Sequence, residues 1–111
     1  MRSSQPAKLL RIHLSETDRH QDKPLYEVIV ARCRELGVAG ATVLAGVEGY
    51  GETAALHHAH LLRHDRPVVI TVIDSAEKIA LLLPVVEGLL ATGVMALSDV
   101  EMIRIQRDKV G

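Results

Sequence analysis

The chain has 111 residues, of which 48% are apolar, and this supports a single domain with a hydrophobic core of its own. A formal net charge of −1 at pH 7 argues against general binding to nucleic acids or to anionic membrane surfaces. The one cysteine, Cys33, excludes an internal disulfide and a multi-cysteine zinc site, and residues 1–8 lack the apolar core of a signal peptide, so a cytoplasmic protein is expected. We place the domain at residues 8–107 and expect residues 1–7 to be a disordered N-terminus.

The first third of the chain has the pattern of a strand, a loop and a helix. Residues 8–14 alternate with the two-residue period of a strand. Residues 15–24 are polar and end in a proline, which indicates a loop. From Leu25 to Leu36 apolar side chains recur at helical spacing, and Gly37 is a stop signal for that helix.

The rest of the chain continues with two strands, a helix and a last strand. We expect these elements at residues 40–47, 67–74, 79–90 and 99–106. Asp74 or Ser75 can cap the start of the helix, and Pro84 inside it should kink it. Residues 79–97 are apolar enough to suggest a membrane span, but their proline and two glycines would weaken a continuous helix. We therefore expect a buried helix followed by a turn, with no membrane insertion.

The order βαββαβ predicts an α+β fold of the ferredoxin-like sandwich type. This fold has a four-stranded antiparallel sheet with two helices on one face. The strand at 67–74 is apolar on both sides, with Val68 and Ile70 on one and Val69 and Ile73 on the other. A strand with apolar side chains on both faces is usually packed against other elements on both faces, and the chain has no further element to pack on the second face. We therefore expect a homo-oligomer in which subunits cover the second face.

A connection of about twenty residues, 46–66, joins the second and third strands, where a hairpin needs only about two to five. It opens with the glycines Gly46, Gly49 and Gly51 in the pattern G-x-x-G-x-G. Consecutive backbone N–H groups at such glycines can form an anion-binding nest, and the alternative is a flexible turn. The pattern lacks the Lys and Ser/Thr of a phosphate-binding P-loop. Both interpretations stay open at this point.

Histidines follow the glycines within the same connection. If residues 52–65 are helical, His57, His60 and His64 share one face. Imidazoles at this spacing can bind Zn²⁺, Ni²⁺ or Cu²⁺, which makes a divalent-metal-binding protein the alternative function. The simpler interpretation is a polar, solvated helix face.

Two further groups of residues bear on catalysis. Glu16, Asp18, His20 and Asp22 crowd one loop, where they could bind a cation or act in acid–base chemistry, or could cap and order the loop. Cys33 lies on the apolar stripe of the first helix, as a small core residue would. No nucleophile and base are paired by local spacing, so we do not expect an enzyme.

Several motifs together resemble the DUF190 (UPF0166) family. They are "DRHQDKPLYEVIV", "GVAGATV", "GVEGYG" and "RPVVITVIDSAEKIALLLPVVEGLL", and the resemblance extends over residues 8 to about 107. The family is similar to the PII signalling proteins. That similarity implies a trimer with a ferredoxin-like fold and a long loop between the second and third strands, the T-loop, which in this chain is the connection 46–66.

The resemblance also implies a ligand and a partner. PII trimers bind adenine nucleotides in clefts between subunits, so ATP, ADP, AMP or a cyclic nucleotide is the expected ligand. The T-loop of PII contacts target proteins. Because genes of the DUF190 family often lie near fluoride-exporter genes, a membrane transporter or channel is the kind of partner that the resemblance suggests.

The resemblance to PII itself is incomplete at the phosphate-binding loop. PII has "TGxxGDGKIFV" there, whereas this chain has "ATGVMALSDVEMIRI", which keeps Thr92 and Gly93 and lacks the lysine. Positive charge would then come from Arg104 and Arg107, because PII uses basic residues at that place, although a strand end or an intersubunit salt bridge would also explain them. The predicted ligand-binding residues are Gly46, Gly49, Gly51, Thr92, Gly93, Arg104 and Arg107.

Overall fold

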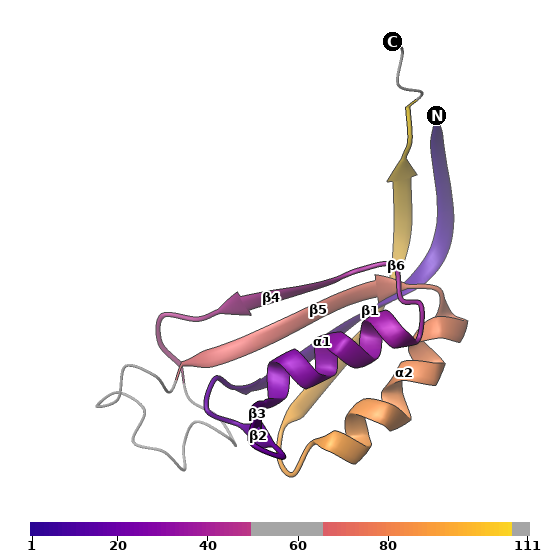
Figure 1. Cartoon of the computed structure of the whole chain (residues 1–111). Coiled ribbons are helices and arrows are strands. Elements are labelled where there is room, and N and C mark those ends of the chain that lie inside the picture. The colour runs from indigo at the N-terminus through magenta and orange to yellow at the C-terminus, as the bar shows by residue number, and fades with distance from the viewer. Residues whose placement is uncertain (50–65, 108–111) are drawn as a thin grey trace.

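The computed structural model describes residues 1–49 and 66–107, which form a sheet covered on one face by helices (Figure 1). The elements in chain order are β1 (Arg2–Ser15), β2 (Arg19–His20), β3 (Lys23–Pro24), α1 (Leu25–Glu35), β4 (Ala41–Ala45), β5 (Pro67–Asp74), α2 (Ala76–Leu89) and β6 (Val94–Ile105). The main sheet is antiparallel with the order β4-β5-β1-β6, and β2 and β3 form a small separate hairpin. The predicted α+β sandwich is confirmed.

The core lies between the helices and one face of the sheet. Pairing of β1 with β5 sets Leu10 opposite Val72 and Ile12 opposite Ile70, so that alternate residues of both strands face the helices. The fully or almost fully buried side chains of the sheet and helices are Leu10, Ile12, Leu14, Leu25, Ile29, Cys33, Val68, Ile70, Val72, Ile79, Leu82 and Val86. The strand and helix periods read from the sequence therefore identify the buried faces correctly.

The helix ends follow the predicted signals. Gly37 has a φ of 75° just beyond α1, a conformation that glycine adopts without strain. The Ser75 side chain accepts a hydrogen bond from the Lys78 N–H at 3.2 Å and caps α2. The Lys78 ammonium in turn donates to the Leu36 carbonyl at 3.1 Å, which ties the start of α2 to the end of α1. The helix α2 continues through Pro84.

The N-terminus differs from the prediction. Residues 2–7 continue β1 and pair with β6, from Arg2 opposite Ile105 to Ala7 opposite Val100, and are therefore not disordered. The ladder is reinforced by an ion pair of Lys8 with Asp99 and a hydrogen bond from Ser4 to Glu101. The polar sequence of residues 1–7 carries no strand period of its own, because its hydrogen-bonding partner lies about a hundred residues away. The last strand likewise begins at Val94, five residues earlier than expected.

Neither helix in residues 1–49 and 66–107 has the length and apolar character needed to cross a bilayer. Residues 79–97, whose apolar character suggested a membrane span, are divided between α2, a turn and β6.

Cys33 is 3% exposed within the core, and this burial raises the pKa of its thiol. The neutral thiol is a small apolar core group and a poor nucleophile. We expect the native protein to react with a chromogenic disulfide reagent at pH 8 on the order of a hundredfold or more slowly than the chain unfolded in urea, because reaction requires the core to open. Equal rates in the two states would show that α1 is not packed on the sheet as described.

Candidate functional site

The predicted ligand-binding glycines that the structure describes gather at one end of the sheet. We call this the loop end: there β1 and β4 finish, and β5 and β6 begin. Gly46 and Gly49 follow β4 at this end, while Thr92 and Gly93 precede β6. Gly51 lies outside the described residues.

The first glycines pack against the ring of Pro67. The Gly46 N–H donates to the Pro67 carbonyl at 2.7 Å, and a Cβ added to Gly46 would lie 2.8 Å from the Pro67 ring. A Cβ on Gly49 would lie 3.2 Å from the same ring. Neither glycine has a positive φ. The Gly46 N–H thus forms a hydrogen bond within the sheet, and the Pro67 ring leaves little room for a side chain at Gly46. Anion binding at these glycines stays a prediction.

Thr92 and Gly93 occupy the turn between α2 and β6. Thr92 is exposed, and a Cβ on Gly93 would lie 3.2 Å from the His13 carbonyl oxygen, so Gly93 packs against the end of β1. Because β5 and β1 separate β4 from β6, three strand spacings of about 4.8 Å place the two predicted glycine loops about 14 Å apart. Both loops nevertheless lie at the loop end of the sheet.

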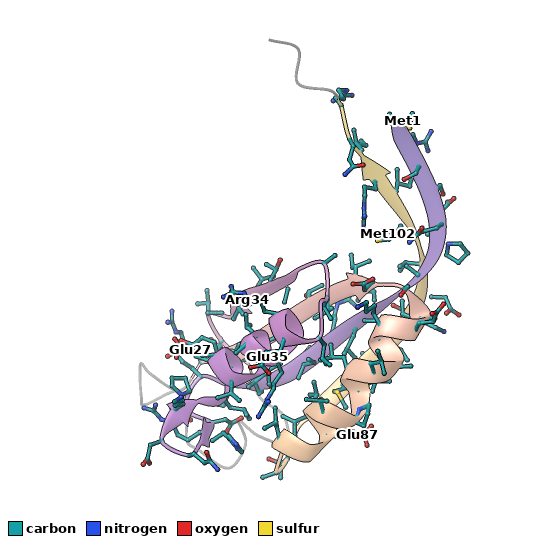
Figure 2. All side chains as sticks on the ribbon, turned by 45° about the vertical axis from the view of Figure 1, so that its right-hand side comes forward. Met1, Glu27, Arg34, Glu35, Glu87 and Met102 are labelled. Carbon is teal, nitrogen blue, oxygen red and sulfur yellow. The ribbon has the colours of Figure 1, made fainter. Side chains whose placement is uncertain are left out.

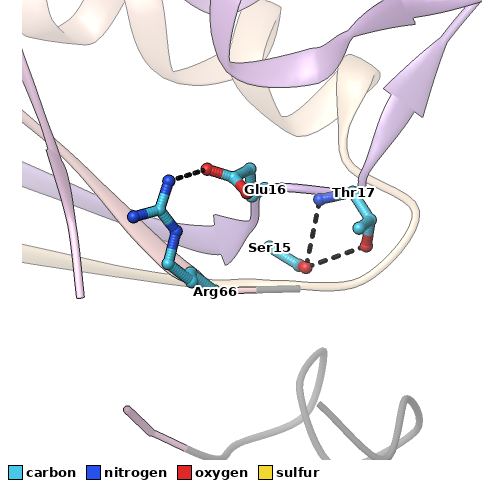
Figure 3. A network of polar contacts seen from close by, with 4 residues as sticks. All are labelled: Ser15, Glu16, Thr17 and Arg66. Carbon is cyan, nitrogen blue, oxygen red and sulfur yellow. Dashed lines mark hydrogen bonds and ion pairs between the residues drawn. The ribbon is translucent and has the colours of Figure 1, made fainter. Parts of the chain in front are cut away.

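Two hydrogen bonds join Arg66 to Glu16 at the loop end, and we call this pair of contacts the Arg66–Glu16 clamp (Figure 3). The sequence analysis did not single out Arg66. The Arg66 guanidinium donates to the Glu16 carboxylate at 2.7 Å, while the Glu16 N–H donates to the Arg66 carbonyl at 2.8 Å. The hydrogen bond and the negative charge of Glu16 raise the pKa of Arg66. The return of the connection 46–66 is therefore fixed to the turn after β1. The position of Arg66, a positively charged residue directly before the strand that begins at Pro67, is the feature of the sequence that could have indicated this role.

In the acidic loop after β1, which holds Glu16 and Asp18, side chains and backbone form hydrogen bonds that order the loop. The Asp18 carboxylate accepts the Ser15 N–H at 2.9 Å, and its carbonyl accepts the Leu25 N–H at 2.8 Å at the start of α1. The Ser15 and Thr17 hydroxyls are 3.0 Å apart (Figure 3). Residues 1–49 and 66–107 contain no group of three or more side chains arranged to hold a metal ion. These contacts favour the loop-ordering role.

The predicted basic residues lie far from the glycines of the same chain. Arg104 pairs across from Ser3, and Arg107 follows the end of β6. Eleven residues of extended strand separate Arg104 from Gly93, a distance of about 36 Å along β6. One chain does not bring these arginines to its own loop end, so a site that uses both sets must lie between chains.

The comparison with known proteins assigns the chain to a family. The DUF190 family model, whose description reads "Uncharacterized ACR", matches residues 7–102. A UPF0166 protein from Aquifex aeolicus (strain VF5) is 41% identical over 98 residues, covering 86% of this chain and 92% of that relative. The chain belongs to the DUF190 family. The motifs in the sequence therefore indicated the family correctly.

Solved structures resemble this DUF190 protein in fold. The apo form of CPII, a nitrogen regulatory PII-like protein from Thiomonas intermedia K12, has a TM-score of 0.66 at 20% identity, covering 95% of this chain and 100% of CPII. CPII bound to ADP and bicarbonate has a TM-score of 0.65 at 21% identity, covering 90% and 91%. At these identities the likeness establishes a PII-like fold for the DUF190 protein.

The metal-binding alternative concerns residues outside the described part of this DUF190 protein. His57, His60 and His64 all fall within 50–65. A divalent-metal site on these histidines stays a prediction.

The sheet face opposite the helices of the DUF190 protein carries exposed apolar side chains, next to the polar side chains of Arg11 and His13. Leu44 is 59% exposed, Val94 is 47% exposed and Ile73 is 39% exposed. Strand pairing sets Leu44 and His13 on either side of Val69, so these side chains share this open face. The prediction that β5 is apolar on both sides is confirmed, and no described element covers the second side.

Proposed function

We propose that this DUF190 protein is a PII-like regulatory protein that acts as a homotrimer, with no catalytic activity. It binds a small anionic ligand, an adenine nucleotide, in clefts between subunits at the loop ends. The connection 46–66 contacts a partner protein, for which a membrane transporter or channel is our candidate. A β-sheet face with exposed Leu44 and Val94 supports the association of subunits, because a large exposed apolar patch usually marks an interface.

The observation that carries the ligand proposal is the placement of the two predicted glycine loops. Gly49 and Thr92–Gly93 lie at the same end of the sheet, whereas Arg104 lies about 36 Å away along β6 and Arg107 lies beyond the end of that strand. A neighbouring subunit can bring its Arg104 and Arg107 to this loop end. The PII-like fold shared with CPII, which has been solved with ADP and bicarbonate, makes an adenine nucleotide the first ligand to test.

The proposed switch uses the fixed ends of the connection 46–66. One end is held by the hydrogen bond from Gly46 to Pro67 and the other by the Arg66–Glu16 clamp. A ligand bound between these ends would alter how the connection contacts its partner protein. The partner would then respond to the ligand.

The ligand is tested by thermal shift with ATP, ADP, AMP, cyclic nucleotides and bicarbonate. A ligand at one hundred times its dissociation constant should stabilise the protein by about 2.7 kcal/mol, which gives a clear rise in Tm. Gly49→Val should reduce the shift by ADP, since a side chain there meets the ring of Pro67. Gly88→Val, where nothing lies within 4 Å, should keep it. A shift that is unchanged in Gly49→Val would contradict the site, and the absence of any nucleotide shift would contradict the ligand.

A further inference from the structure

The sheet extends beyond its body as a two-stranded arm, defined as residues 2–7 of β1 with residues 100–105 of β6 (Figure 1). Pairing with β5 ends where Lys8 faces Asp74, so within residues 1–49 and 66–107 the arm has no third strand, and Figures 1 and 2 show no helix of this part of the chain beside it. An isolated two-stranded ribbon is at best marginally stable in water. The arm therefore needs support from outside its own subunit.

One side of the arm carries two exposed isoleucines between opposite charges. Ile103 is 47% exposed and Ile105 is 60% exposed. Both lie on the same side of β6 as Glu101, which is nearer the body, and Ile105 faces Arg2 across the ladder. From body to tip, this side of the arm thus has the acid Glu101, then Ile103, and then Ile105 level with the base Arg2.

A groove of about 390 Å³ lies between α1 and β4 at the opposite edge of the sheet. Its lining residues are Tyr26, Glu27, Val30, Ala31, Arg34 and Val43. Along α1 the order is again acid, apolar, base: Glu27 first, then Val30 and Ala31, then Arg34. No strand in the described chain pairs with the outer edge of β4, and such an edge is a template for pairing with another chain.

The two surfaces match in charge and length when they run in opposite directions. The rise from Glu27 to Arg34 is about 10 Å along the helix. The distance from Glu101 to Ile105 is about 13 Å along the strand. Arg2 can therefore meet Glu27 while Glu101 meets Arg34, which places Ile103 over the apolar middle of the groove and Ile105 at its Glu27 end.

The groove that receives the arm belongs to another subunit. The arm continues β1 and β6 in a regular ladder, whereas the groove lies beyond β5 at the β4 edge of the same subunit. Figure 2 shows Met1 and Met102 on the arm, away from Glu27 and Arg34 on α1. We propose that the arm of one subunit docks into the α1–β4 groove of a second copy, with Arg2 against Glu27 and Glu101 against Arg34. This contact rests on the proposed association of subunits and adds to it a second surface beside the open face.

Charge reversal tests the pairing directly. Sedimentation velocity over a concentration series should show that Glu27→Arg and Arg2→Glu each weaken assembly about tenfold or more, because each change places like charges together. The double variant should assemble within about threefold of the parent, since it restores an opposite pair. Glu87→Arg, on α2 and outside the groove, should assemble as the parent does (Figure 2). Single variants that assemble normally, or a double variant that is no better than either single one, would overturn the proposal.

Disulfide trapping gives a second measurement that does not depend on charge. Ile103→Cys and Ala31→Cys, which the proposed alignment sets opposite each other, are prepared separately, mixed and oxidised; the native Cys33 is buried and does not compete. A disulfide that joins one copy of each variant is expected, and disulfides formed only between identical copies would contradict the docking. The readouts separate this contact from the proposed function. If the protein binds ADP but the double variant does not restore assembly, the proposed function stands and the arm contact is wrong. If the double variant restores assembly but no nucleotide binds, the arm contact stands and the proposed ligand is wrong.

Discussion

Leu82→Ala is expected to lower the free energy of unfolding by about 2–5 kcal/mol. Leu82 is 0% exposed in α2 and belongs to the cluster that joins both helices to β1 and β5. Removing its three outer carbons loses apolar burial and leaves a cavity that the neighbours fill only in part. Because a domain of this size is stable by about 5–15 kcal/mol in total, the loss should be visible as a large shift of the urea midpoint.

The adjacent Leu81 provides a matched control. It has the same side chain in the same helix but is 57% exposed. Leu81→Ala should change the free energy of unfolding by no more than about 0.5 kcal/mol. Both variants are compared with the parent at one protein concentration, so that assembly contributes equally. Equal losses in the two variants would mean that α2 does not present Leu82 to the core.

Leu44→Asp is expected to weaken the association of subunits by at least about a hundredfold in dissociation constant. Leu44 lies on the open face, where register aligns it with Val69 and His13. That face carries no acidic side chain on β4, β5 or the body part of β1, and a carboxylate placed at position 44 would lose its hydration when subunits meet there. The expected product is a folded monomer, which light scattering after gel filtration should detect.

Leu81→Asp is the control for this second prediction. Leu81 and Leu44 are exposed to almost the same extent, 57% and 59%, but Leu81 lies on the helical side of the molecule. Leu81→Asp should therefore leave the mass of the assembly unchanged. If it dissociated the protein and Leu44→Asp did not, subunits would meet through α2, and the open face would not be the interface.

Local patterns determined much of this fold. The strand at 67–74, the end of α1 before Gly37 and the cap of α2 at Ser75 all lie where the sequence places them. Each depends on the period of neighbouring side chains or on a hydrogen bond within three residues. The family could also be inferred from the sequence, because its motifs are themselves runs of adjacent residues.

The candidate site was predictable only in part. The sequence indicated that Gly46 and Gly93 are special positions, and for Gly46 it left an anion-binding nest and a turn open. The structure shows that Gly46 packs against Pro67, twenty-one positions later, and that its N–H forms a hydrogen bond within the sheet. Arg66 was missed for the same reason, since its partner Glu16 is fifty residues away.

Adjacent residues in the chain therefore determined the order of the two helices and the four main-sheet strands, their buried faces and the apolar second side of β5, whereas the hairpin of β2 and β3 lies in a segment expected to be a loop. The tertiary structure alone decided that residues 2–7 form a strand, that β6 begins at Val94 and that Arg104 lies far from the glycines. Strand pairing is the physical reason. A polar segment without a period of its own becomes a strand when a distant segment satisfies its backbone hydrogen bonds, and no local pattern records which segment that is.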